Sequence, residues 1–415
     1  MIGRILTKGR QAYERPQNWL GNNYTVPCCV IVVPLSLFGY SYGGEIWSHM
    51  QRDRAGENPH GLPSEVGILG VAVSIDDFSA DDIWFQTNEH GEYKKDLKHR
   101  IYAASLIRWG EGNYAIMNEG SIDVINPAHG STKSIPTGVN AFGMMSGVQS
   151  ENGTHLLLKT FSEESADRLF TLTDGERTRP VWVDWELEPE HFAVSDEGEA
   201  FILQRDEDRK GFCITSFTYT GTVQRNCERM DRDRYVDLTV FGFIQGTPYL
   251  FVDWLSDTGD GGWYVYKRDV DGWKRVNGQS VFSYDAKKQG YIVERFALNG
   301  RIYMLSEEAG LLSFPIPTAD TVDLDARFTD LSDSINGPLI SYTVDGNIIH
   351  YVFYKSDDVF SGPYLVSFNI DDPSKRVGPW EIPPELVRES LFSSYREIRS
   401  TIIYDQKTRE KLGAQ

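Results

Sequence analysis

The sequence has few of the residues and motifs that identify a known chemistry. It contains only four cysteines and eight histidines, and none of them lies at a metal-binding spacing. A Gly-x-Ser-x-Gly nucleophile turn and the glycine-rich loops of nucleotide-binding proteins are also missing. We therefore predict no cofactor and no metal, and no motif designates a catalytic residue.

Positive charge is scarce as well. The chain has 41 Lys and Arg against 60 Asp and Glu, which gives a formal net charge of −19. A surface this acidic repels nucleic-acid phosphates and anionic lipid headgroups. The charge excludes nucleic acid as a partner and favours a basic protein partner, with solubility alone as the alternative reading. The acidic residues are spread over many loops rather than gathered in one run.

Glycine, by contrast, recurs at a regular interval. Six times a glycine precedes a short apolar strand, at spacings of 41 to 54 residues: Gly112, Gly153, Gly198, Gly246, Gly300 and Gly346. Three of them follow Asn or Asp, in the pairs Asn152-Gly153, Asn299-Gly300 and Asp345-Gly346. Such pairs favour type I′ hairpin turns, in which both central residues have positive φ. A repeat of this length is typical of solenoids and propellers.

Each glycine-led unit continues with further short strands. After Gly246 come the apolar runs 249–254 and 263–266, followed by the turn Asp271-Gly272. No helical periodicity interrupts these units, and four antiparallel strands in about 40 to 50 residues is the size of one propeller blade. Over residues 64–405 the sequence therefore resembles the β-propeller superfamily, although it lacks the Trp-Asp, kelch and complete aspartate-box signatures.

The two ends of this region suggest how the ring closes. Residues 66–75 and 83–86 form a hairpin upstream of the six units, and residues 398–404 form one more strand downstream. Pairing the C-terminal strand with the N-terminal hairpin would remove both open edges. We predict an all-β fold, a β-propeller of about seven four-stranded antiparallel blades, with six or eight blades as alternatives.

The N-terminal part has a different character. Residues 1–23 form a basic tail, and residues 24–44 form a run of about bilayer-spanning length without charge. We predict a membrane anchor over 24–44, a linker over 45–63 and a C-terminal tail over 406–415. The positive flank places the main domain outside the cytoplasm, in the periplasm if the source is bacterial. A cleaved signal peptide and a buried segment are the alternatives.

Two cysteines support export. Cys213 and Cys227 flank a predicted three-residue turn at 219–221, which would place them opposite each other on paired strands. Opposite side chains in such a pair lie near disulfide range. Because disulfides persist in oxidising compartments, we predict this disulfide in an exported domain.

Paired acidic and aromatic residues are the remaining candidates for a site. The tripeptide Val-Asp-Trp occurs twice, and an acidic loop follows its second copy; the candidate binding residues are Asp184, Trp185, Asp253, Trp254, Asp257 and Asp260. Carboxylates beside indoles could line a sugar site, and the alternative is that the indoles pack between blades.

These observations favour a non-catalytic, protein-binding propeller, with a periplasmic immunity or inhibitor protein that neutralises a basic effector or toxin as one specific version. A carbohydrate-active hydrolase using carboxylates near the propeller axis and a scaffold subunit of a membrane complex are the alternatives.

Overall fold

The computed structural model describes residues 62–74, 83–88, 91–96, 106–118, 120–139, 141–162, 168–183, 188–206, 210–230, 234–256, 261–276, 292–306, 310–316, 326–331, 335, 339–354, 363–383 and 396–414. Two compact units divide the chain, Met1–Pro59 and His60–Gln415. The predicted basic tail and anchor lie outside the described residues, as does the linker except for its last two positions. The following description concerns the second unit.

This unit consists of seven four-stranded antiparallel sheets, which we number as blades with the innermost strand first. Blade 1 comprises β28 (Arg396–Ile403), β1 (Ile68–Ser74), β2 (Ile83–Asn88) and β3 (Gly91–Asp96). Blade 2 comprises β4 (Ile107–Arg108), β5 (Tyr114–Asn118), β6 (Ser121–Asn126) and β7 (Ser131–Pro136). Blade 3 comprises β8 (Ala141–Gln149), β9 (Leu156–Ser162), β10 (Arg168–Thr173) and β11 (Thr178–Val183).

The other four blades follow in chain order. Blade 4 comprises β12 (Glu188–Val194), β13 (Ala200–Arg205), β14 (Gly211–Phe217) and β15 (Gln224–Arg229). Blade 5 comprises β16 (Arg234–Ile244), β17 (Thr247–Ser256), β18 (Gly261–Asp269) and β19 (Gly272–Arg275). Blade 6 comprises β20 (Ile292–Leu298), β21 (Arg301–Ser306), β22 (Gly310–Pro315) and β23 (Arg327–Asp330). Blade 7 comprises β24 (Leu339–Asp345), β25 (Ile348–Phe353), β26 (Tyr364–Asn369) and β27 (Arg376–Glu381).

Apolar side chains join each blade to the next. Seven clusters of buried hydrophobic residues lie at the seven interfaces between neighbouring blades. Between blades 5 and 6, for example, Phe251 packs against Trp263 and Phe314. Between blades 7 and 1, Val352 belongs to the same cluster as Ile68. Because this last interface joins the final blade to the first, the domain is a closed seven-bladed β-propeller, as predicted.

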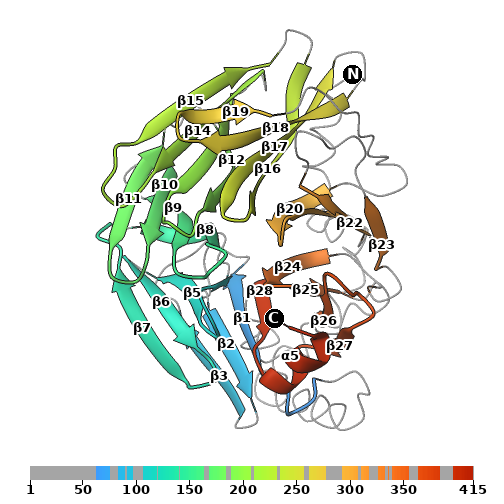
Figure 1. Ribbon diagram of the computed structural model, residues 1–415. Helices are drawn as coiled ribbons and strands as arrows, with labels where there is room; N and C mark the ends of the chain where they lie inside the picture. The colour runs from blue at the N-terminus through green and yellow to red at the C-terminus, as the bar shows by residue number, and fades with distance from the viewer. Residues whose placement is uncertain are drawn as a thin grey trace, which may run out of the picture. The chain divides into compact units, whose positions relative to one another are not determined.

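Blade 1 contains both ends of the propeller. β28 pairs with β1 from Ile403↔Ile68 to Arg396↔Ser74, so the C-terminal strand completes the sheet that the N-terminal strands begin. Figure 1 shows β28, in red, beside the blue β1. The predicted ring closure is confirmed, and a third N-terminal strand, β3, extends the predicted hairpin.

The six repeated glycines share one place and one conformation. Each lies in the turn between the first and second strand of its blade, with φ between 62° and 77°. At Asn299-Gly300 both central residues have positive φ, which is the predicted type I′ turn. Gln245-Gly246 forms the same kind of turn without the Asn or Asp that indicates it.

The type I′ prediction is wrong at the other two pairs. The turn containing Asn152-Gly153 is longer, and the Gly153 amide donates back to the Ser150 carbonyl at 2.9 Å. In the second pair Asp345 ends β24, so Gly346 is the first central residue and only it has positive φ. The glycine is needed in both turns. A longer loop changes the turn at Asn152-Gly153, whereas at Asp345-Gly346 the loop keeps two residues and the glycine occupies its first rather than its second position.

The innermost strands carry a feature that the repeat does not indicate. In six of the seven blades the register between the first and second strand shifts. In blade 4, Glu190 is the extra residue between the pairs Pro189↔Gln204 and His191↔Leu203. Such β-bulges bend a strand and increase its local twist. The bulges therefore give the innermost strands extra twist where they surround the axis.

The predicted C-terminal tail contains a short helix, α5 (Gln406–Leu412). Asp405 caps its first turn by accepting the Thr408 amide, and Gly413 ends it in the left-handed conformation. Leu412 is fully buried, so the helix is docked on the propeller.

A turn glycine provides a clean test of the repeat. A Cβ at Gly300 would meet no atom within 4 Å, so any cost of Gly300→Ala comes from its positive φ. We expect a loss of about 1–2 kcal/mol in the free energy of unfolding, measured by urea denaturation. Asn299→Gly is the matched control and should change stability by less than about 0.5 kcal/mol. Equal effects of the two substitutions would contradict this account of the turn.

Candidate functional site

Of the six binding residues predicted from the sequence, two lie in the part of the chain that the structure describes. Asp253 and Trp254 lie on β17 of blade 5. Asp184, Trp185, Asp257 and Asp260 lie outside the described residues, in the connections from β11 to β12 and from β17 to β18.

Trp254 is an interior residue. Its side chain is 2% exposed and belongs to the apolar cluster between blades 4 and 5. The indole stacks on the ring of Tyr264 at 6.0 Å, and the Arg234 guanidinium lies 4.1 Å from the indole centre. A cation over an aromatic face contributes about 0.5–2 kcal/mol. The indole thus packs between blades, and a binding role for the six predicted residues stays a prediction.

A different group of charged side chains surrounds Asp345, at the end of the innermost strand of blade 7. We call it the Asp345 cluster; it comprises Arg108, Tyr114, Asp345, His350 and Arg409. Asp345 is 1% exposed and accepts hydrogen bonds from Arg409 Nη1 and, at 3.1 Å, from Tyr114 Oη. Arg108 Nε lies 3.7 Å from the second carboxylate oxygen. The cluster joins blades 2 and 7 to α5.

The cluster is held in one charge state at neutral pH. Burial alone would raise the pKa of Asp345, but the nearby His350 imidazole and the charges of Arg409 and Arg108 outweigh burial and lower it. His350 is fully buried, with Nε2 at 3.8 Å from Asp345 and Nδ1 at 2.8 Å from Ser367 Oγ. Burial lowers the pKa of this imidazole, so it is neutral beside an ionised Asp345.

Three more carboxylates are engaged by tyrosines across blade interfaces. Glu228 of blade 4 accepts from Tyr266 of blade 5 at 2.8 Å, and Asp371 of blade 7 accepts from Tyr303 of blade 6 at 3.0 Å. Tyr342 of blade 7 donates to Glu294 of blade 6. Burial raises the pKa of all three phenols, so they act as neutral donors. These contacts fasten neighbouring blades together.

The described part of the chain offers little for metal or acid–base chemistry. Within it, no group of three or more His, Cys, Asp and Glu side chains could hold a metal ion. The strongly perturbed Asp345 is paired with two arginines, which suits a structural ion pair better than a general acid or base.

None of the helices in the described ranges has the length and hydrophobicity that a bilayer crossing requires.

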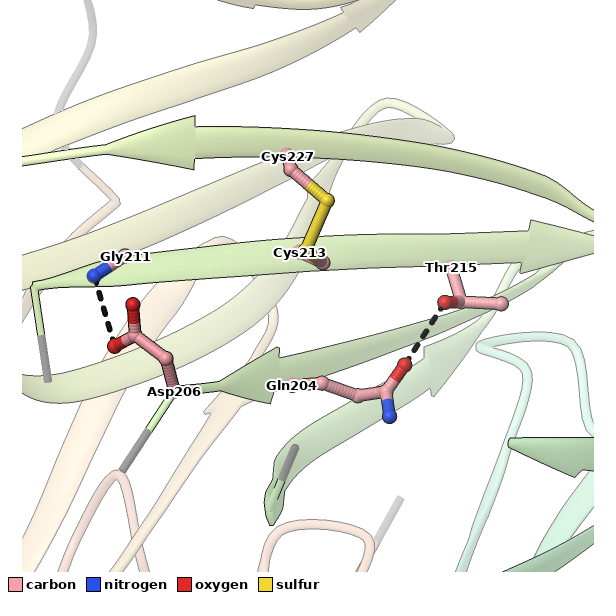
Figure 2. Close-up of a disulfide and its surroundings, with 6 residues drawn as sticks. All are labelled: Gln204, Asp206, Gly211, Cys213, Thr215 and Cys227. Carbon is pink, nitrogen blue, oxygen red and sulfur yellow. Dashed lines mark hydrogen bonds between the residues drawn. A yellow bond between two sulfur atoms is a disulfide. The ribbon is translucent and has the colours of Figure 1, made fainter. Parts of the chain in front are cut away.

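The predicted disulfide is present. Cys213 on β14 and Cys227 on β15 are direct partners across the two strands, and their Cα atoms are 4.0 Å apart. Figure 2 shows the sulfur bridge between these strands. The strand pairing ends at Ser216↔Gln224, so the predicted register is right although the connecting loop is longer than three residues.

The strand β14 is also held on its other side. Thr215 donates to the buried Gln204 of β13 at 3.0 Å, and the Gly211 amide donates to Asp206 at 2.9 Å (Figure 2). The disulfide joins this well-packed strand to β15, whose side chains are almost all exposed. It therefore attaches the outermost strand of blade 4 covalently to the core.

Comparisons with known proteins assign neither a family nor a function to this chain. No family model matches the sequence, and no curated protein matches it. Among solved structures, the chain is similar to a proposed 6-phosphogluconolactonase from Bacteroides fragilis, with 9% identity, a TM-score of 0.44 and coverage of 84% of this chain and 100% of that one.

Two further solved structures show likenesses of the same order. The β-propeller domain of the Trilobed protease from Pyrococcus furiosus is 11% identical, with a TM-score of 0.44 and coverage of 74% of this chain and 99% of that one. TolB from Acinetobacter baumannii is 12% identical, with a TM-score of 0.36 and coverage of 82% of this chain and 66% of that one. The assignment as a seven-bladed β-propeller rests on the strand pairing and the ring of interfaces.

Sequence reasoning missed the Asp345 cluster. In the sequence, Asp345 stands out only as the first residue of a turn pair, and Arg409 lies in the predicted C-terminal tail. The two residues are 64 positions apart, and no local pattern connects them. The acidic residue before Gly346, in the last of the six repeat turns, is the local signal that the sequence offers.

Buried histidines give the domain a pH-dependent stability. Burial lowers the pKa of His350, and burial with the nearby Arg295 charge lowers that of His191 to about 3. The unfolded chain therefore binds more protons below about pH 6.5, and stability falls on acidification by up to about 1.4 kcal/mol per pH unit for each histidine. We expect the melting temperature to drop between pH 7 and pH 5. His350→Gln should reduce this slope, while the exposed His129→Gln should leave it unchanged; equal slopes would contradict the assignment.

The disulfide should contribute measurable stability. It closes a loop with a sequence separation of 14, for which chain entropy predicts about 3 kcal/mol. The double variant Cys213→Ala, Cys227→Ala should lose stability by that order in urea denaturation. Reduced wild-type protein is the control and should show a similar loss. A double variant as stable as the oxidised protein would show that other contacts already hold β15.

Proposed function

We propose that this propeller is a non-catalytic binding protein that acts outside the cytoplasm and recognises a basic protein partner. The observation that carries the proposal is the sequence of the connections between the second and third strands of the blades. These connections are residues 75–82, 119–120, 163–167, 206–210, 257–260, 307–309 and 354–363. Each contains at least one acidic residue, and together they hold 17 acidic and 3 basic residues.

The strand order determines at which face of the ring these acidic connections begin and end. Every blade has the same strand order and direction, so connections of one kind leave the ring at one face. The strand ends that the connections between blades join also lie at that face, and Asp184 and Trp185 belong to one of these connections in the sequence. Loops around a rigid ring are the usual place for recognition residues. An acidic rim would attract a basic partner and speed its association.

The disulfide supports a location outside the cytoplasm. Such bonds persist outside the cytoplasm, and this one was expected from a register argument that is independent of the N-terminal segment. We propose that residues 24–44 anchor the chain in a membrane. A periplasmic immunity or inhibitor protein that neutralises a basic effector or toxin is the specific version that would combine anchor, export and acidic rim.

Binding and charge can be tested together. Full-length protein should capture a basic partner from native membranes, and capture should weaken as salt rises. Replacing Asp76, Asp77, Asp81 and Asp82 with Asn should reduce capture. The matched control replaces four acids at turns of the opposite face, Glu151→Gln, Glu176→Gln, Glu197→Gln and Asp271→Asn, and should capture normally. Equal losses in both variants would contradict recognition by this face.

A chain lacking residues 1–50 distinguishes a binding propeller from a scaffold subunit of a membrane complex. A binding propeller should still capture its partner, whereas a scaffold subunit that assembles through the N-terminal segment should not. If mass spectrometry finds Cys213 and Cys227 as free thiols in protein from its native compartment, the proposed location loses its main support.

A further inference from the structure

Blade 1 lacks the connection that the other blades have. In blades 2 to 7 a turn with a positive-φ glycine joins the first strand to the second. In blade 1 these strands are β28 and β1, which come from opposite ends of the propeller and meet only by pairing. Blade 1 therefore has no turn between its first and second strands, and another segment can occupy that position.

Residues 404–414 occupy that place. The Tyr404 amide donates to the Gly67 carbonyl at 3.0 Å, just before β1 begins. Asp405 caps α5 with one oxygen, at 2.8 Å from the Thr408 amide, and accepts the Gly67 amide with the other, at 3.2 Å. One carboxylate therefore ties the helix, which follows β28 in the chain, to the residue before β1.

Position 67 must be a glycine because the ring of Tyr404 lies so close to it. A Cβ on Gly67 would lie 2.6 Å from the Tyr404 ring. The Tyr404 hydroxyl donates to the Thr87 carbonyl at 2.6 Å and accepts the Gln86 side chain at 3.0 Å, so this ring also contacts the third strand of blade 1.

The other end of the helix is fixed to blade 7. Asn369 donates to the Leu412 carbonyl at 2.8 Å, and Asn347 donates to the Gly413 carbonyl at 3.1 Å. The Leu412 carbonyl ends α5 and the Gly413 carbonyl belongs to its C-cap, at the end where a helix leaves carbonyls without an internal partner. Blade 7 thus supplies the C-terminal hydrogen bonds of the helix.

Arg409 links the helix to the blades on both sides. Its guanidinium donates to Asp345 of blade 7 and, at 3.1 Å, to the Ile403 carbonyl that ends β28. It also lies 3.5 Å from the Tyr114 hydroxyl of blade 2. Removing one member of a buried ion pair leaves the other unpaired, and this is among the most destabilising changes in a protein.

We propose that residues 404–414 are a clasp that replaces the missing turn and controls where the ring opens. With the Arg409–Asp345 pair intact, blade 1 is held at both sides; when the clasp detaches, blade 1 opens locally while distant blades stay folded. Blades contact mainly their neighbours, so a local opening does not require the whole ring to unfold. This device is independent of the proposed binding function.

Hydrogen exchange followed by mass spectrometry tests the clasp on the full chain under non-reducing conditions. Arg409→Ala should raise exchange rates in β28, β1 and β5 about tenfold or more, since tenfold corresponds to only about 1.4 kcal/mol. Blade 4 should exchange as in the wild type. Lys411→Ala, an exposed position on the same helix, is the control and should leave all blades unchanged. A uniform rise over all blades, or a match to Lys411→Ala, would overturn the proposal.

A double-mutant cycle keeps the test informative if Arg409→Ala folds poorly. In an Asp345→Asn background, Arg409→Lys and Arg409→Ala should have much smaller effects on exchange in β28 and β1 than in the wild type, because the partner charge is gone. Additive effects would show that the pair does not hold the clasp. Deletion of residues 406–415 should reproduce the Arg409→Ala pattern, and a deletion that leaves β28 protected would refute the role of α5.

Discussion

The pairing of β28 with β1 is the contact on which the whole domain depends. Six blades are each formed by one continuous stretch of chain, but without a seventh blade the facing apolar sides of blades 7 and 2 would be uncovered. The antiparallel register between the two chain ends supplies that blade, and the apolar clusters on either side of it complete the circle of interfaces. In blades 2 to 7 a short turn joins the first strand to the second, whereas in blade 1 this pair must be assembled from residues more than 300 positions apart.

A blade closed by the two chain ends needs contacts beyond strand pairing to hold its last strand. Strand pairing alone leaves the last strand free to fray, because it has no turn behind it. The buried Asp345 cluster and α5 lie where that weakness would be greatest. The ion pair of Asp345 with Arg409 buries charge at the place in the ring that lacks a covalent turn.

The sequence predicted the repeated parts of this structure well and the unique parts poorly. Blade length, strand number and closure followed from six glycines whose conformational role is local. The Cys213–Cys227 contact followed from a strand register, which is also local. By contrast, the bulges of the innermost strands and the contact of Asp345 with Arg409 depend on how blades crowd around the axis, and neither leaves a periodic signal.

The candidate site shows the same division. Trp254 was chosen because an indole beside a carboxylate can bind a ligand, yet its position between blades 4 and 5 is a consequence of tertiary packing. The acidic residues, on the other hand, appeared scattered in the sequence. The strand order groups many of them into one class of connection, a grouping that the linear chain conceals.

The disulfide has a consequence for how this protein can evolve. An outermost strand is normally kept in place by the apolar side chains it buries, and these restrict its sequence. In β15 nearly all side chains face solvent, and Cys227 bonds the strand covalently to buried Cys213. Apart from Glu228, which accepts the Tyr266 hydroxyl, the exposed positions of β15 bury few side-chain atoms, so they can change with little loss of packing. Blade 4 offers a surface strand on which new contacts can be selected while the ring itself stays unchanged.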